Sequence, residues 1–202
     1  MTISLQQLKK SRLYSEELGI NLADNTDKEL FKWFLASILF GARISETIAK
    51  HTYLTFKHYR LLTPQKILQV GWDYLVDPIM QEGGYVRYDG KTSSTLLQIC
   101  ESLLDEYNGS LLTLHNKAHD HQDLEARLER FYGVGPITAN IFLRELRPYW
   151  EKSDPEPLPI AKEAANRLGI DLGQFNRKTI TFTRIEAGLI RLRKEIKTQR
   201  LR

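Results

Sequence analysis

The chain is poor in the residues that build disulfides and metal clusters. It has 202 residues and a single cysteine, Cys100, so neither an intramolecular disulfide nor a four-cysteine iron–sulfur cluster can form. Cys100 lies among leucines of a predicted helix, and we expect it to be a core thiol. No apolar run approaches the length of a membrane-spanning helix, and the first residues lack the apolar region of a secretory signal. These absences predict a soluble protein of a reducing, intracellular compartment.

A strong charge of one sign is missing as well. Lysine and arginine number 29 against 25 for aspartate and glutamate, which gives a net charge of +4 and a pI near 9.1. This mild excess permits an anionic partner without requiring one. Hydrophobic residues make up 42% of the chain, which is enough for a core in one sizeable domain or in two small lobes.

The hydrophobic periodicity is helical almost throughout, which predicts an all-α fold. Two helix starts carry a predicted capping residue, Thr26, with Glu29 completing a capping box, and Ser45; Thr63 and Pro64 start a third helix. Strand-like runs are short, as at 179–182. The predicted helices cover residues 26–40, 45–56, 63 onward, 91–107, 123–131, 137–146, 160–168 and 183–198, the last of which is basic.

The most informative segment, residues 131–140, reads Phe-Tyr-Gly-Val-Gly-Pro-Ile-Thr-Ala-Asn and separates two predicted helices. Gly133 and Gly135 allow a tight turn and the close approach of another backbone. Pro136 suits the first position of the second helix, because its missing N–H group is not needed there. The start of that helix leaves N–H groups unpaired, which makes an anion-binding site. Since the turn holds no side chain that reads a base, a nucleic-acid phosphate is the expected anion.

This segment resembles the helix-hairpin-helix motif in the form found in base-excision DNA glycosylases of the endonuclease III type. Residues 42–46, 83–91, 106–109 and 166–169 resemble further segments of that family in the same order, so the similarity runs from about 26 to about 169. The resemblance implies an all-α, two-lobed fold with a cleft between the lobes. One lobe comprises residues 1–25 and about 145–202. The other comprises residues 26–144, and the hairpin itself lies at 123–147.

The resemblance also implies a function in base-excision repair. Glycosylases of this family flip a damaged or mismatched base out of duplex DNA and cleave its N-glycosidic bond. Members that also cut the strand carry a lysine directly after the turn, where this chain has Ile137. We therefore predict a monofunctional DNA glycosylase that activates water, and Lys91 and Lys162 are the other amines within reach of a pocket. The alternative is a non-catalytic helix-hairpin-helix protein that binds DNA and has lost glycosylase activity.

The catalytic carboxylate of the family, an aspartate that stabilises positive charge on the sugar, has two candidate counterparts. Counting forward from the hairpin leads to Asp154, the first choice for the acid, and Glu156, the second. Counting back from residues 166–169 leads instead to Leu158, and the ancestral activity is then lost or rebuilt. The alternative for both acids is that they are solvated charges of the proline-rich loop 148–159.

Two sets of residues are predicted to touch DNA. Contacts to the backbone, or to the gap left by a flipped base, are expected from Arg43, Lys91, Gly133, Val134, Gly135, Ile137 and Thr138. Arg43 stands where the family has a gap-filling glutamine, and a surface pairing with Glu46 or a phosphate is its alternative role. Stacking on the flipped base is expected from Tyr88 and Trp150, against the alternative that aromatic side chains belong to the core.

No cofactor is predicted. His115, His119 and His121 lack a cysteine partner and a helical ligand spacing, so a charged loop cluster is expected in place of a metal site. The resemblance allows a monovalent cation bound by carbonyl groups of the hairpin turn. The expected partner is double-stranded DNA with a lesion or mismatch, and no binding to a membrane is expected. A monomer is expected, in the cytoplasm or associated with the nucleoid.

Overall fold

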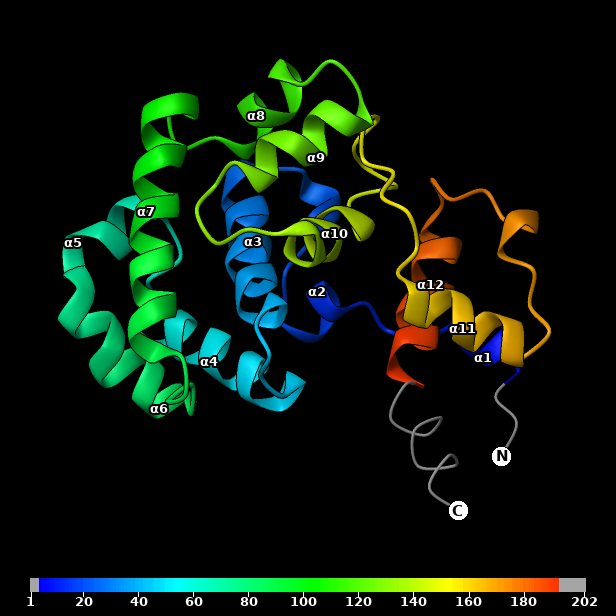
Figure 1. Ribbon diagram of the computed structural model, residues 1–202, viewed down its shortest axis with the longest axis horizontal. Coiled ribbons are helices and arrows are strands. Elements are labelled where there is room, and N and C mark those ends of the chain that lie inside the picture. Colours follow the sequence, from blue (N-terminus) through cyan, green and yellow to red (C-terminus); the bar gives the residue numbers. More distant parts are fainter. Residues whose placement is uncertain (1–3, 193–202) are drawn as a thin grey trace.

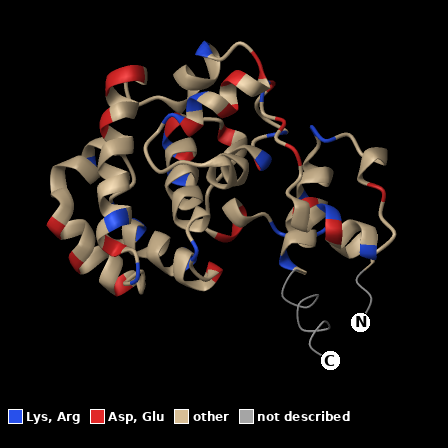
Figure 2. Cartoon of the chain, viewed as in Figure 1, with Lys and Arg blue, Asp and Glu red and all other residues tan. Residues whose placement is uncertain are grey.

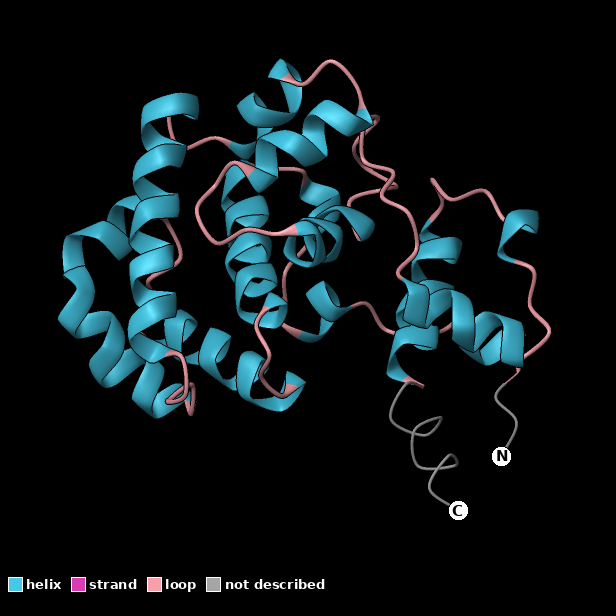
Figure 3. Ribbon diagram, viewed as in Figure 1, coloured by secondary structure: helices cyan, strands magenta, loops and turns pink. Residues whose placement is uncertain are grey.

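All regular secondary structure of the described chain is helical. The computed structural model describes residues 4–192, and every element in that range is a helix or a helical turn (Figure 3). The prediction of an all-α fold is therefore confirmed. Within the same range no helix combines the length and the apolar character needed to cross a membrane.

The strand-like interpretation of residues 179–182 is wrong. Thr179 caps helix α12 (Ile180–Arg191), and its Oγ1 accepts a hydrogen bond from the N–H group of Phe182 (3.2 Å). A short β-branched run resembles a strand, but the hydroxyl cap and the buried pair Ile185 and Leu189, four residues apart, favour a helix. The predicted helix at 183–198 thus begins earlier, and its residues 193–198 lie outside the described range.

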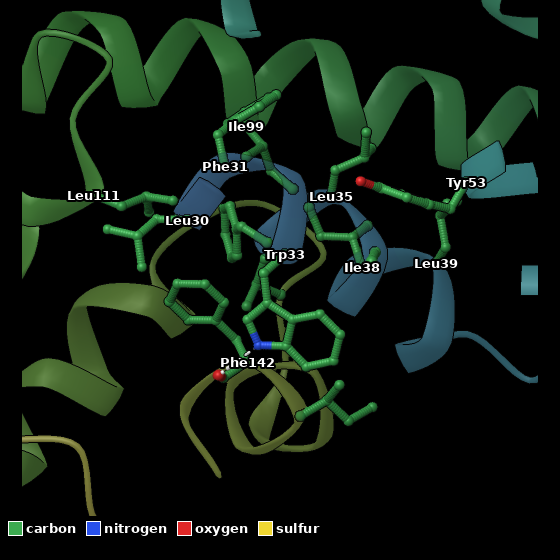
Figure 4. Packing of buried hydrophobic residues seen from close by; sticks show 14 of the residues in the cluster. Leu30, Phe31, Trp33, Leu35, Ile38, Leu39, Tyr53, Ile99, Leu111 and Phe142 are labelled. Atoms are coloured by element: carbon green, nitrogen blue, oxygen red, sulfur yellow. Dashed lines mark hydrogen bonds between the residues drawn. The ribbon is translucent and has the colours of Figure 1, made fainter. Parts of the chain in front are cut away.

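Helix α3 (Asp27–Gly41) lies at the centre of the larger of two hydrophobic clusters (Figures 1 and 4). It is buried on nearly every side, as expected for a helix that other helices surround. Helices α4 (Glu46–His58), α8 (Leu111–Lys117) and α10 (Pro136–Arg144) pack against it. Trp33 is fully buried, and its Nε1–H donates to the carbonyl oxygen of Phe142 (2.9 Å), which joins α3 to α10 (Figure 4).

The remaining elements of this part are α2 (Tyr14–Glu17), η1 (Leu22–Asp24), α5 (Pro64–Tyr74), η2 (Leu75–Met80), α6 (Gln81–Gly83), α7 (Asp89–Tyr107) and α9 (His121–Glu129). The predicted caps Thr26 and Ser45 are confirmed, and Thr63 caps its helix in the same way, because each of the three hydroxyls accepts the N–H group three residues on. The capping box is only half formed. The carboxylate of Glu29 accepts the N–H group of Asn21 (3.1 Å) and not that of Thr26.

A smaller hydrophobic cluster lies to one side of the first (Figure 1). Helices α1 (Leu5–Leu8), α11 (Pro159–Arg167) and α12 form it. The turn η3 (Leu172–Gln174) lies between α11 and α12 in the chain. Gly188 allows the close contact of α12 with α1, because a Cβ there would lie 2.6 Å from Leu8 Cδ2. The buried side chains of the smaller cluster are Leu8, Ala161, Ala164, Ala165, Ile185, Leu189 and Leu192.

The two clusters divide the chain differently from the lobe boundaries expected from the sequence. Leu13, Leu18 and Leu22 belong to the larger cluster, although residues 1–25 were assigned to the terminal lobe. Leu146 and Trp150 also belong to the larger cluster, beyond the expected boundary near 145. Apart from Ala187 of α12, which also belongs to the larger cluster, the buried side chains of the two clusters divide before residue 13 and after residue 150.

Candidate nucleic-acid interface

Helices α9 and α10 form a hairpin around the turn of residues 130–135, as the sequence predicts. Gly133 has a φ of +77°, and a Cβ there would lie 2.8 Å from Thr95 Cγ2, so this position requires glycine. Gly135 is the N-cap of α10, and a Cβ there would meet nothing within 4 Å. One glycine thus shapes the turn, and the other leaves the start of α10 open.

The N–H groups at the start of α10 are unpaired. Within the described chain those of Gly133, Gly135, Ile137 and Thr138 have no hydrogen-bond acceptor. These free donors and the positive end of the helix dipole make a site for an anion. Ile137 is 51% exposed, so this site is open to an anion from solvent.

Val134 departs from its predicted role as a DNA contact. Its side chain is 4% exposed and packs in the larger cluster. Its N–H group is already used, because it donates to the carbonyl oxygen of Phe131 (3.0 Å). Val134 therefore anchors the turn to the core and offers neither its side chain nor its N–H group to a ligand.

Five of the predicted site residues line one cavity of about 400 Å³ beside the turn. They come from three separate segments of the chain: Arg43, Tyr88, Lys91, Gly133 and Thr138. Arg43 and Lys91 are exposed, and neither forms a hydrogen bond or an ion pair with any residue of the range 4–192. Both cations are therefore available to a ligand held at the start of α10. The expected alternative pairing of Arg43 with Glu46 does not form, because Glu46 pairs with Lys50.

These cations are local to the turn and are not part of a broad basic face. Figure 2 shows basic and acidic residues mixed along most of the helices. The guanidinium carbon of Arg87 lies over the ring of Tyr88, 5.2 Å from its centroid. Electrostatic attraction of a polyanion thus rests on a few placed side chains.

Trp150, predicted to stack on a flipped base, is a core residue, and that prediction is wrong. It is 1% exposed, and its Nε1–H donates to Asn25 Oδ1 (2.8 Å). Its ring stacks on His115 at 4.5 Å between centroids and meets Phe142 edge-on. The indole therefore packs in the larger cluster, whereas Tyr88, the other predicted stacking residue, lines the cavity beside the turn.

The acidic loop is held by arginines. Arg177, which the sequence analysis did not single out, donates from Nε to Asp154 Oδ1 (2.9 Å) and from Nη1 to the Glu156 carboxylate. Arg147 Nε lies 3.5 Å from the same Asp154 oxygen. The order of charges along the chain, an acidic loop followed by Asn-Arg-Lys at 176–178, was the only signal for this clamp. Both acids are therefore ion-paired, although the side chain of Glu156 is also 68% exposed to solvent.

Glu156 is the candidate acid that lies closer to the hairpin. It lines a cavity of about 310 Å³ together with Ile137 and Leu158, whereas Asp154 does not line it. Lys162 Nζ donates to Glu156 Oε2 (2.9 Å). The hydrogen bonds from Lys162 and Arg177 lower the pKa of Glu156 to about 2. The carboxylate is therefore ionised at neutral pH, and two cations neutralise it.

Glu156, which the forward count reaches, and Leu158, which the backward count reaches, line the same cavity. Leu158 is the N-cap of α11, and it lines a second cavity with Ile137, a cleft of about 520 Å³ between the two hydrophobic clusters. Ile137 stands at the position predicted to correspond to the family's catalytic lysine, and Leu158 at the position that the backward count assigns to its aspartate. Both side chains are apolar.

No group of metal ligands occurs among the described residues. His115 is stacked on Trp150, and the backbone N–H group of His119 donates to Asp123 Oδ2 (2.9 Å). Cys100 is buried as predicted, and burial raises the pKa of its thiol to about 12.

Comparisons of this chain with models of protein families, with curated proteins and with solved structures found no match.

Proposed function

We propose that this chain binds duplex DNA through backbone phosphates at the hairpin between α9 and α10. One observation carries the proposal: unpaired N–H groups at the start of α10 lie beside a cavity lined by two unpaired cations, Arg43 and Lys91. Backbone N–H groups and positive side chains are the usual partners of DNA phosphates. The turn contributes glycine, valine and proline, so it supports binding that is independent of base sequence.

We assign to the chain a two-lobed helix-hairpin-helix fold of the glycosylase type. Two hydrophobic clusters with a cleft between them support this assignment. The hairpin helix α10 contributes Ile137 and Ile141 to the wall of the cleft. DNA held at the turn before α10 therefore lies next to the cleft.

The geometry favours a binding role over excision. Hydrolysis of a glycosidic bond needs a carboxylate that meets the positive charge developing on the sugar. Here two cations already contact the carboxylate of Glu156, and Asp154 is bonded to Arg177. Ile137 and Leu158 bring no charge to the cleft. Of the two functions predicted from the sequence, these contacts favour the alternative, a DNA-binding protein without glycosylase activity.

Binding is tested with one pair of variants at the same residue. Gly135→Ala adds a methyl group in open space, so the affinity for a 20-base-pair duplex is expected to stay within about twofold of wild type. Gly135→Asp adds a carboxylate where the phosphate lies, and affinity at low salt is expected to fall at least tenfold on every duplex sequence. Fluorescence anisotropy of labelled duplexes measures both. Equal affinity of the Asp variant and wild type contradicts the proposal.

Excision is the second candidate function, and the placement of Glu156 supports it. The ionised carboxylate lies in the same cavity as Ile137. Incubation with duplexes carrying deaminated, alkylated, oxidised and mismatched bases, followed by alkaline cleavage of abasic sites, tests it. Release of a base that Glu156→Gln lowers by about 10² or more establishes the glycosylase. Release that survives both Glu156→Gln and Asp154→Asn assigns the chemistry to other residues. We expect no release by wild type.

A further inference from the structure

The cavity of about 400 Å³ beside the hairpin turn contains two buried hydroxyl groups. Thr95 of α7 and Thr138 of α10 line it, and each residue is only 6% exposed. Neither hydroxyl has a hydrogen-bond partner within the described range 4–192, although buried hydroxyls are normally bonded. Both groups are therefore open to a polar ligand that enters the cavity.

The two hydroxyls lie beside free N–H groups of the hairpin. A Cβ at Gly133 would lie 3.1 Å from Thr95 Oγ1, which places this hydroxyl against the turn. Thr138 is the third residue of α10, and its own N–H group is among the unpaired donors. A Cβ at Gly41, the last residue of α3, would clash with Thr138 Oγ1, so glycine there leaves the room that this hydroxyl occupies. N–H and O–H donors thus meet inside one cavity.

The charge of the cavity is positive and uncompensated. Arg43 and Lys91 are the charged residues of its lining, and both lack an ion-pair partner in the described part of the chain. A phosphate within a DNA strand carries one negative charge, whereas a phosphate monoester carries about 1.5 to 2 at neutral pH. The two cations therefore match the charge of a terminal phosphate better than that of a bridging one.

The depth of the cavity also favours a strand end. Arg43 and Lys91 are exposed, whereas Thr95 and Thr138 are buried, so the hydroxyls lie deeper than the cations. A phosphate within a strand is esterified on two sides, and the chain on both sides keeps it near the surface. A terminal phosphate has a single ester bond and three free oxygens. It can pass the cations and bring its oxygens to the hydroxyls.

We propose that this cavity binds the terminal phosphate of a DNA strand, at a nick, a gap or a duplex end. The proposal rests on the proposed binding of phosphates at the hairpin, and it names the kind of phosphate that binds most tightly there. Thr95, Thr138 and the free N–H groups of the turn donate to the phosphate oxygens, and Arg43 and Lys91 neutralise their charge. An intact duplex contacts only the outer donors and the cations.

Duplexes that differ by one phosphate test the proposal. Fluorescence anisotropy compares the affinity of the full chain for four DNAs: an intact duplex, a duplex with a one-nucleotide gap and no phosphate at it, and the same gap with a 5′- or a 3′-phosphate. At least one phosphorylated gap is expected to bind at least tenfold more tightly than the unphosphorylated gap, and the preferred form identifies the end that enters.

The outcomes separate this proposal from the proposed function. Equal affinity for all three gapped duplexes overturns the binding of a terminal phosphate and leaves duplex binding at the hairpin in place. Absence of binding to any of the four DNAs contradicts both proposals.

Variants of the buried threonines locate the site. Thr95→Val removes the hydroxyl but keeps the shape, and it is expected to lower the preference for the phosphorylated gap at least threefold. Thr95→Ser restores a hydroxyl and is expected to keep most of the preference, which distinguishes a lost hydrogen bond from a folding defect. A preference that survives the double variant Thr95→Val with Thr138→Val contradicts the proposed site.

Thr55→Val is the matched control. Thr55 is a threonine of α4 that is 7% exposed, and its Oγ1 donates to the carbonyl oxygen of His51 (3.1 Å). It lines none of the three cavities described. Its substitution is expected to leave the preference for the phosphorylated gap unchanged.

Inorganic phosphate distinguishes a strand end from a free ion, because both offer the same oxygens. Competition is expected to remove the preference for the phosphorylated gap only at phosphate concentrations at least a hundredfold above the Kd of that duplex. The reason is that the strand end is also held by contacts of its neighbouring phosphates with the turn. Inorganic phosphate that binds as tightly as the phosphorylated gap overturns the assignment to a strand end.

Discussion

Glu156 shows how neighbours decide the behaviour of a single acidic residue. Its side chain is 68% exposed, yet Lys162 and Arg177 both contact it and lower its pKa to about 2. From the sequence it could be assigned only as a loop acid near the hairpin, because the placement of both partners depends on how α11 and the segment before α12 pack. The stacking role predicted for Trp150 is wrong for a related reason. Its position next to a proline-rich loop favours exposure, whereas its ring belongs to the core.

The acid dependence of stability follows from that pKa. The folded pKa of Glu156 lies below the ordinary value of 4.5, so the unfolded chain binds more protons in this range and stability falls as pH falls. Its contribution is present above pH 4.5 and is lost as pH approaches 2. Glu156→Gln is expected to lower the free energy of unfolding by less than about 1 kcal/mol at pH 6, as for exposed ion pairs.

Urea unfolding at several pH values checks this prediction. The difference between wild type and Glu156→Gln is expected to shrink between pH 4.5 and pH 2.5. Glu101→Gln, at an exposed glutamate, is the control and should show no such change. A difference that stays constant or grows toward acid pH contradicts the expected sign.

At the scale of elements, the hairpin rests on two glycines with different duties. Gly133 is confined by its positive φ and by Thr95, whereas Gly135 has an ordinary φ of −104° and open space. The sequence pattern indicates that both matter but does not separate the two reasons. The difference depends on the contact with α7, which lies about forty residues earlier in the chain.

Alanine substitutions separate these duties. Gly133→Ala is expected to lower the free energy of unfolding by about 1–3 kcal/mol, from the left-handed backbone and the Thr95 contact. Gly135→Ala is expected to change it by less than about 0.5 kcal/mol. In the double variant Gly133→Ala with Thr95→Ser the lost methyl relieves the contact and leaves the backbone part. Equal effects at both glycines in denaturant titrations refute this assignment.

The elements that the sequence predicts well are those marked by local chemistry. Hydroxyl caps at Thr26, Ser45 and Thr63, and glycine at the hairpin, act within four residues and are legible in the chain. Contacts between distant segments are not. The cavity that joins Arg43 to Lys91 depends on how α3, α7 and α10 pack, and no periodicity in the sequence encodes that packing.

At the scale of the whole molecule, a buried ion pair joins the two clusters. Arg147 follows α10 and is 1% exposed, and its Nη1 donates to the carboxylate of Glu186 in α12, also 1% exposed. The same guanidinium lies 5.2 Å from the ring centroid of Phe182 and donates to the carbonyl oxygen of Pro155. Arg147 thus connects α10, the acidic loop and α12 at one point.

Removal of one partner is expected to be worse than removal of both. Glu186→Leu leaves the buried guanidinium with only the half-buried Asp154, 3.5 Å away, as its counter-charge, and is expected to cost about 3 kcal/mol of stability. The double variant Arg147→Met with Glu186→Leu should recover a large part of that loss. Thermal unfolding measures the stability, and hydrogen exchange measures protection of α11 and α12. Additive losses in the double variant contradict the interpretation.

The burial of Cys100 has a practical consequence for chemical labelling. It is the only cysteine of the chain, and with its thiol in the core it reacts poorly with maleimide reagents. A cysteine introduced at an exposed position is then the only reactive thiol. Thr47→Cys in α4 and Asn166→Cys in α11 place one dye on each side of the cleft. Energy transfer between them reports directly whether duplex DNA closes the two parts of the molecule around it.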